Sequence, residues 1–75
     1  MKEIFLARQP VELFKILKFE GIASSGGEAK RLIADGQVEV NGVAETRKRK
    51  QIVADDVISF GDEQYVMRLQ PVEGS

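Results

Sequence analysis

The chain has 75 residues, of which 43% are hydrophobic, and it contains neither cysteine nor histidine. A chain of this length forms one domain with a small core. The missing residue types exclude disulfides, thiol and imidazole catalysis, and zinc sites built from Cys or His. No apolar run approaches the ~20 residues of a membrane span, and the first residues lack the pattern of a secretory signal. We therefore expect a soluble, cytoplasmic monomer that forms a single domain over residues 1–75.

The net charge is −1, from eleven basic and twelve acidic residues, but these charges are unevenly distributed. Ten of the eleven Lys and Arg residues precede residue 51, and four of them are consecutive at 47–50 (Arg-Lys-Arg-Lys). Because salt screens charges over about 8 Å at physiological ionic strength, a ligand that touches this run is little affected by distant acids. Local charge, and not the total, therefore decides which partners are attracted.

The first part of the chain predicts a short strand and then an amphipathic helix. Residues 3–6 are mostly apolar and form the expected strand. Pro10 suits the first turn of a helix, where a missing N–H costs nothing. From residue 11 to residue 20, apolar and charged residues fall on different faces at helical spacing. Gly21 is placed to end this helix in the left-handed conformation.

A second helix is predicted from the segment Ser-Gly-Gly-Glu at residues 25–28. Ser25 and Glu28 have the spacing of a capping box, in which each side chain satisfies a free backbone N–H of the other. Gly36 then ends the helix. Its two sides differ: the inner one carries Ala29, Leu32 and Ile33, and the outer one carries Gly27, Lys30, Arg31 and Ala34.

The rest of the chain predicts strands. Residues 37–40 alternate between polar and apolar, Asn41-Gly42 is the strongest short-range signal for a hairpin, and residues 43–46 are expected to return antiparallel. Further strands are expected at 57–60 and 65–69, with a frayed segment from Pro71 onward. The order β-α-α-β-β-β-β indicates an α+β fold, with two packed helices on one side of a small, mostly antiparallel sheet.

The basic run at 47–50 is the most distinctive feature. Four like charges in a row repel one another unless a partner neutralises them, and phosphates are the natural partner. A solvated loop, or a sheet edge protected by charge, is the alternative interpretation. Other positive charges lie on the outer faces of the predicted helices: Lys15 and Lys18 on the first, Lys30 and Arg31 on the second.

The glycine pair at the start of the second helix allows two interpretations. Gly26 and Gly27 could let another backbone approach closely, with the free N–H groups of the helix start favouring an anion. They could equally relax a tight turn between the helices.

The sequence gives little support for a catalytic function. Asp55 and Asp56 are adjacent and lack a third ligand nearby, so we expect turn-forming roles rather than a metal site. No histidine is present to activate a serine. Phe14 and Phe19 fall on the apolar side of the first helix, so we expect them in the core rather than stacked on bases. We therefore predict a protein that is not an enzyme and needs neither cofactor nor metal.

Several motifs then follow one another with a particular spacing. They are Leu13-x-x-x-Leu17 with Gly21, Ser25 with Ala29-Lys30-Arg31-Leu32-Ile33, Gly36-x-Val38-x-Val40-Asn41-Gly42, the basic run, and Asp56-Val57-Ile58. From Leu13 to Phe60 this pattern resembles the αL RNA-binding motif of the S-four domain family. The segments Ser-Gly-Gly-x-Ala-Lys and Glu-Thr-Arg-Lys-Arg-Lys are most similar to its stand-alone bacterial YbcJ-like members.

The resemblance implies a module for structured RNA, ribosomal or transfer RNA, which would be recognised by its phosphate backbone and shape during ribosome assembly or translation. Its core would span residues 11–60. The candidate RNA-binding residues are Lys15, Lys18, Ser25, Gly26, Gly27, Lys30, Arg31, Asn41, Arg47, Lys48, Arg49 and Lys50. The sequence departs from the family in three ways: Gly26 stands where many members have Arg, Ala54-Asp55-Asp56 replaces a Gly-Asp turn, and the last third is acidic. The alternative is a protein-interaction adaptor whose basic loop docks an acidic partner.

Overall fold

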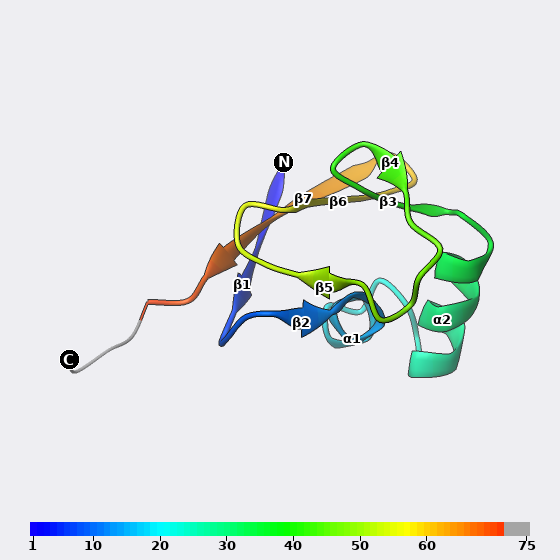
Figure 1. Ribbon diagram of the computed structural model, residues 1–75, viewed down its shortest axis with the longest axis horizontal. Helices are drawn as coiled ribbons and strands as arrows, with labels where there is room; N and C mark the ends of the chain where they lie inside the picture. Colours follow the sequence, from blue (N-terminus) through cyan, green and yellow to red (C-terminus); the bar gives the residue numbers. More distant parts are fainter. Residues whose placement is uncertain (72–75) are drawn as a thin grey trace.

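Five strands form the main sheet of the computed structural model, which describes residues 1–71 (Figure 1). In spatial order they are β1 (Lys2–Leu6), β7 (Glu63–Leu69), β6 (Val57–Phe60), β3 (Val38–Val40) and β4 (Val43–Ala44). β1 pairs with β7 in parallel, and the other pairs are antiparallel. The segment predicted to be frayed begins at Pro71, and its residues 72–75 lie outside the described part.

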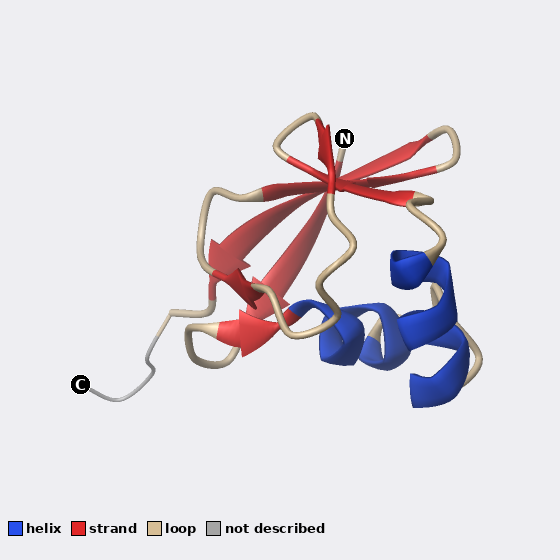
Figure 2. Cartoon of the chain, turned by 45° about the vertical axis from the view of Figure 1, so that its right-hand side comes forward, coloured by secondary structure: helices blue, strands red, loops and turns tan. Residues whose placement is uncertain are grey.

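Both helices lie on the same side of this sheet, below it in the view of Figure 2. They are α1 (Leu13–Phe19) and α2 (Gly26–Ala34), and they pack against each other. This arrangement confirms the predicted α+β fold. Within residues 1–71, neither helix has the length and apolarity needed to cross a bilayer.

Two short strands were not predicted. β2 (Val11–Glu12) and β5 (Gln51–Ile52) form a separate antiparallel ribbon at the start of α1. The predicted start of the first helix was therefore wrong, because the helix begins at Leu13 and Pro10 lies before β2. Pairing with β5 keeps residues 11–12 extended, and the N-cap residue Glu12 has φ −68° and ψ 138°.

The ends of α2 follow the sequence closely. The Ser25 hydroxyl oxygen accepts a hydrogen bond from the backbone N–H of Glu28 at 3.1 Å, as a capping box predicts. The reciprocal bond is replaced, because the Glu28 carboxylate accepts from the Ser24 hydroxyl instead. Gly36 follows the helix with φ +75°, the left-handed conformation expected of a C-terminal glycine.

The hairpin between β3 and β4 is confirmed. Asn41 and Gly42 both have positive φ, 54° and 84°, as the two-residue hairpin turn that matches strand twist requires. The returning strand is shorter than predicted and ends at Ala44, although the N–H of Glu45 still donates to the carbonyl of Val38 at 2.9 Å. Beyond it, the carbonyls of Lys48 and Lys50 bind the backbone at the start of α1.

The core lies between the helices and the sheet. Its fully buried side chains are Leu13, Leu17, Ile33, Val38, Ile52, Ile58 and Met67. Phe14 packs partly against this core, but Phe19 is 71% exposed, so its predicted burial was wrong. At 100° per residue, Phe19 lies about 110° from the middle of the buried face of α1, so its ring lies outside that face.

Candidate nucleic-acid interface

The basic run is fixed to the first turn of α1 by its backbone. The N–H of Leu13 donates to the carbonyl of Lys50 at 2.9 Å, and the N–H of Phe14 donates to the carbonyl of Lys48 at 3.1 Å. Figure 1 shows the segment descending from β4 to this point beside α2. Its side chains remain free of the core, since Arg47, Lys48 and Arg49 are exposed and Lys50 is half-buried.

Lys30 of α2 lies at the same place. Its ammonium nitrogen is 4.7 Å from the centroid of the Phe14 ring, a cation–π arrangement. Because the backbone of Phe14 also binds Lys48, one residue of α1 joins a lysine of α2 to the basic run. Cations far apart in sequence therefore meet on one side of the molecule.

Glu12 draws two further cations together. Its carboxylate oxygens lie 3.0 Å from Nζ of Lys15 and 3.6 Å from Nε of Arg49. Exposed ion pairs of this kind contribute little to stability. Their effect is positional, because Glu12 holds a lysine of α1 beside an arginine of the basic run.

Arg47 is held by Glu45. Its Nε and Nη2 donate to the two carboxylate oxygens at 2.9 and 3.1 Å, and its backbone N–H donates at 3.0 Å. The side-chain hydrogen bond from Arg47, followed by the backbone one, lowers the pKa of Glu45 from 4.5 to about 2. The same pairing raises the pKa of Arg47. This arginine is therefore oriented before any ligand arrives.

Lys18 and the glycine pair lie next to each other where α1 meets the start of α2. A Cβ built on Gly26 would lie 3.9 Å from Cδ of Lys18, and one built on Gly27 would lie 3.9 Å from the Ser25 hydroxyl. Neither glycine has positive φ. Backbone conformation and internal packing thus leave room for larger residues at both positions.

Asn41 and Arg31 are placed differently from the other candidates. The Asn41 side chain donates to Asp56 at 3.1 Å and accepts from the N–H of Val57 at 2.9 Å. The β3–β4 turn that carries it lies at the opposite end of the molecule from α1 in Figures 1 and 2. Arg31 is exposed in the last turn of α2. The structure thus gathers Lys15, Lys18, Lys30 and the basic run but leaves Asn41 apart.

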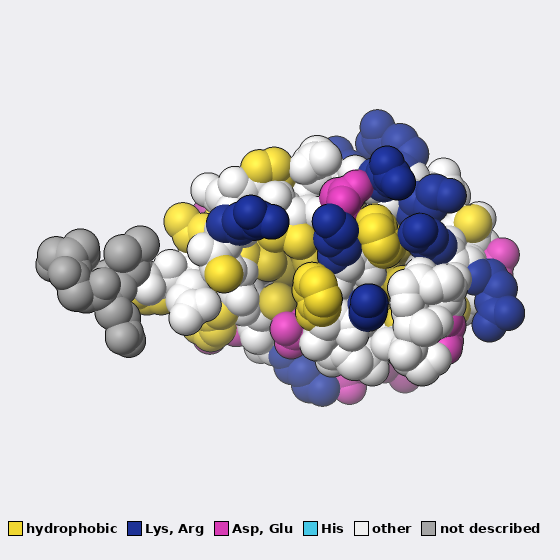
Figure 3. All heavy atoms as spheres, turned by 90° about the horizontal axis from the view of Figure 1, so that it is seen from below, with side chains coloured by type: hydrophobic (Ala, Val, Ile, Leu, Met, Phe, Trp, Pro, Cys, Tyr) yellow, Lys and Arg dark blue, Asp and Glu magenta, His cyan; other side chains and the backbone are white. Residues whose placement is uncertain are grey.

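Seen from below the view of Figure 1, the molecule shows many Lys and Arg side chains, with a few acidic and apolar ones between them (Figure 3). Several of the gathered cations have no acidic partner within residues 1–71: Lys18, Lys30, Lys48 and Lys50. This face therefore keeps positive charge available for an anionic ligand, although the net charge of the chain is negative.

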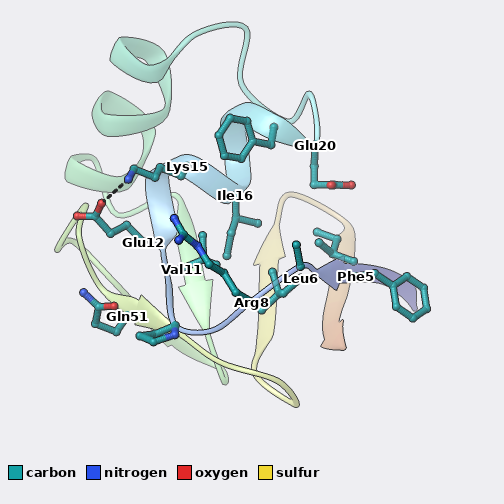
Figure 4. A pocket seen from close by; sticks show the side chains of 13 residues that line it. Phe5, Leu6, Arg8, Val11, Glu12, Lys15, Ile16, Glu20 and Gln51 are labelled. Carbon is teal, nitrogen blue, oxygen red and sulfur yellow. Dashed lines mark ion pairs between the residues drawn. The ribbon is translucent and has the colours of Figure 1, made fainter. Parts of the chain in front are cut away.

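An open groove of about 580 Å³ borders this face, between β1, β2 and α1 (Figure 4). Lys15 and Glu12 line it together with Arg8, and two exposed aromatic residues, Phe5 and Phe19, lie at it. The groove was not predicted from the sequence. Its walls depend on the β2–β5 ribbon, and no local sequence pattern indicates a two-residue strand.

The two adjacent aspartates lie at the turn between β5 and β6, as predicted, where Asp55 has φ 76°. Asp56 accepts from the backbone N–H of Val53 at 3.0 Å, and Asp55 pairs with Arg68 at 2.8 Å. Across residues 1–71, no cluster of three or more acidic side chains could hold a metal ion.

Comparison with known proteins agrees with this geometry. A family model described as the S4 domain matches residues 4–68. The Escherichia coli protein named "Putative RNA-binding protein YbcJ" is 51% identical over 61 residues, which cover 80% of this chain and 87% of that protein. A tyrosine–tRNA ligase of Gluconobacter oxydans is 32% identical over 73 residues, which cover 89% of this chain and 17% of the ligase.

The fold recurs in a solved structure. The solution structure of YbcJ from Escherichia coli, described as having an αL motif involved in RNA binding, superposes with a TM-score of 0.69 at 45% identity, covering 91% of this chain and 87% of that one. The sequence resemblance to YbcJ-like proteins is thereby confirmed. Since the family model spans both helices and all but the outermost residues of the sheet, the chain belongs to the S4 domain family.

Proposed function

We propose that this protein is a non-catalytic RNA-binding module that recognises structured RNA, ribosomal or transfer RNA, in ribosome assembly or translation. One observation carries the proposal: Phe14 binds the carbonyl of Lys48 with its backbone and the ammonium group of Lys30 with its ring. Three elements distant in sequence thereby present their cations on one face. A folded polyanion is the ligand that such a face fits.

The rigidity of the basic run supports recognition by shape. Two backbone hydrogen bonds tie it to α1, and Glu45 orients Arg47. A surface that is already ordered loses less conformational entropy on binding. The cations can therefore match the spacing of phosphates in a folded RNA, with no need to read individual bases.

The glycine pair fits the same proposal. Gly26 and Gly27 open α2 beside Lys18, and nothing inside the protein requires them to be glycine. Without side chains there, an RNA backbone can approach the first turn of the helix closely. Ser25 supports this surface by capping α2, while Asn41 fixes the hairpin by its bonds to Asp56 and Val57.

The relatives support RNA as the partner class. YbcJ is named for RNA binding, and the ligase is named for a transfer RNA. Contacts to phosphates would come from Lys15, Lys18, Lys30, Arg31 and the basic run, with Arg31 extending the face along α2.

Binding of a fluorescently labelled RNA hairpin, measured by anisotropy over a range of salt concentrations, tests the proposal. If about five phosphates are neutralised, each contributes ~0.7–0.9 to the slope of log K against log salt. Affinity should then fall several-hundred-fold for a fourfold rise in salt. Affinity that does not change with salt would contradict the proposal.

The adaptor alternative has the basic loop dock an acidic partner, to which the exposed side chains of Arg47, Lys48 and Arg49 would be available. It predicts that the purified protein carries no nucleic acid at any salt concentration. The RNA proposal predicts nucleic acid that co-purifies at low salt and is removed by a high-salt wash, as the absorbance ratio at 260 and 280 nm would report.

A further inference from the structure

The groove between β1, β2 and α1 combines a buried apolar floor with an exposed aromatic wall. Ile4, Leu6 and Ile16 line it and are almost fully buried. Phe19 lines it too and is 71% exposed. Single exposed apolar residues are ordinary on protein surfaces. Here, however, the exposed ring of Phe19 borders a groove with a buried apolar floor, which is typical of a ligand site. Phe5 (55%) also borders the groove, but its ring lies apart, along β1, in Figure 4.

Polar groups surround this apolar centre. Figure 4 shows Arg8 extending across the groove toward the ion pair of Glu12 and Lys15, with Glu20 at the far end of α1 and Gln51 opposite. Within residues 1–71, neither Arg8 nor Glu20 forms an ion pair. The groove thus offers a flat apolar surface, hydrogen-bonding groups at its edges and positive charge at its rim.

The geometry points to a subsite for one unpaired nucleobase, which stacks on Phe19 while Arg8 and Lys15 bind the phosphates beside it. This inference rests on the proposed RNA-binding function and names the class of RNA: a duplex interrupted by an unpaired nucleotide, in preference to a continuous duplex. Proteins commonly recognise such nucleotides by stacking them on aromatic side chains.

Continuity with the cation face favours RNA as the occupant. Lys15 lies at the groove and, through Glu12, beside Arg49 of the basic run. Lys18, which lies next to α2, also has its Nζ 5.9 Å from the centroid of the Phe19 ring. A strand of RNA that crosses the cation face would therefore meet Lys15 or Lys18 where it enters the groove.

The carboxylates of the groove argue against an acidic peptide. Glu12 and Glu20 would repel its side chains, whereas a nucleobase is neutral and its amino groups can donate hydrogen bonds to carboxylates. Gln51 can bond either kind of base edge, because its amide both donates and accepts. A nucleobase therefore uses every kind of group that the groove presents.

Three RNA hairpins of the same stem sequence test the inference: one fully paired, one with a single bulged nucleotide, and one with an abasic residue at the bulge. Their dissociation constants are measured by anisotropy for the wild type and for Phe19→Ala, Phe19→Leu and Phe19→Trp. Phe19→Leu keeps apolar surface but removes the flat ring. Val43→Ala, which truncates another exposed apolar residue (69%) on β4, is the matched control.

The wild type should bind the bulged hairpin more tightly than the other two. Phe19→Ala and Phe19→Leu should weaken that one complex by between about fivefold and about 150-fold, which corresponds to the ~1–3 kcal/mol of stacking per base. Phe19→Trp and Val43→Ala should retain the preference. Thermal melting should be unchanged in Phe19→Ala, since the ring is exposed.

Several outcomes would overturn the subsite. If the wild type binds all three hairpins alike, or if Phe19→Ala weakens them equally, the subsite is wrong but RNA binding stands. If the protein without RNA sediments as a dimer that Phe19→Ala dissociates, the groove is an interface between copies. If no hairpin binds at any salt concentration, the proposed function itself fails, and the subsite with it.

Discussion

The backbone N–H of Phe14 binds the carbonyl of Lys48 at 3.1 Å, while the ring of the same residue faces the ammonium group of Lys30. The hydrogen bond involves main-chain atoms only, so any residue with a carbonyl at position 48 can form it. The loop can therefore change its side chains without losing its position on α1.

The backbone of the basic run positions the loop, and its side chains are proposed to bind RNA. Replacing Arg47, Lys48, Arg49 and Lys50 together by Ser tests the second role without removing the first. The backbone bonds to α1 persist, and the ion pairs that the replacement removes are exposed, so Tm should fall only by the small contribution of the Arg47–Glu45 pair. RNA affinity should fall, and the slope of log K against log salt should decrease by up to about three units, ~0.7–0.9 for each phosphate that is no longer bound. Calorimetry and anisotropy measure the two effects. A large decrease in Tm would show that the run is structural.

Lys30 provides a single-site test of the cation face. Lys30→Gln should weaken binding of all structured RNAs about equally and lower the salt slope by about one unit, as expected for a phosphate contact. Lys2→Gln is the matched control, because Lys2 is an exposed lysine paired with Glu63 at the opposite end of the molecule from α1 (Figure 1). Equal effects of the two substitutions on RNA binding would refute a localised face.

Gly27 should show opposite effects on stability and binding. Gly27→Ala reduces the freedom of the unfolded chain and meets no close neighbour, so it should raise the free energy of unfolding by up to about 1 kcal/mol. It should also weaken RNA binding severalfold, because a methyl group obstructs the approach of the RNA backbone. Urea unfolding and anisotropy measure these changes.

Ala34→Gly serves as the control in the same helix. It should lower stability without weakening RNA binding, since it removes a methyl group from α2 and so adds no obstruction to the approach of RNA. If Gly27→Ala binds RNA as tightly as the wild type, then the glycine pair serves only the connection between the helices.

Glu45 should make stability depend on pH in the acidic range. Because the hydrogen bonds from Arg47 lower the pKa of Glu45 to about 2 in the folded protein, the folded state holds this carboxylate ionised while an unfolded chain protonates it nearer 4.5. The contribution to stability is therefore complete above pH 4.5 and lost as the pH falls toward 2. The free energies of unfolding of the wild type and Glu45→Gln, measured with urea, should differ near neutral pH and become equal in acid. A difference that does not change with pH would exclude this role.

The core should tolerate little loss of volume. Leu17 is fully buried between the helices and the sheet, and Leu17→Ala should lower the free energy of unfolding by about 2–5 kcal/mol. A domain of this size has a total stability of only about 4–11 kcal/mol, so the variant should be partly unfolded at 37 °C. Circular dichroism measures this, with Val43→Ala expected to melt like the wild type. If Leu17→Ala and Val43→Ala melted alike, the burial of Leu17 in the core would be contradicted.

The elements with strong local signals were predictable from the sequence. Ser25 with Glu28, Gly36, and Asn41-Gly42 each set a helix end or a turn through their own backbone and side chain, and the structure has those features at those positions. Local chemistry decides such features, so the chain around them carries enough information.

The features that depend on residues distant in sequence were not predictable. Residues 11–12 continue the helical pattern of α1, yet pairing with residues 51–52 keeps them extended. Phe19 fits the apolar pattern of α1, but only the arrangement of the neighbouring elements leaves its ring exposed. The face that joins Lys30 to the basic run likewise arises from tertiary packing, so the sequence links the two only through the family resemblance and not through any local pattern.

The parallel pairing of β1 with β7 joins residues 2–6 to residues 65–69. The earliest strand to be synthesised therefore finds its partner only among the latest. While the polypeptide emerges, Ile4 and Leu6 remain without their cross-strand neighbours until about sixty further residues have been added. Completion of the sheet thus depends on synthesis as far as residue 69, whereas α1 and α2, neighbours in the chain, can meet much sooner.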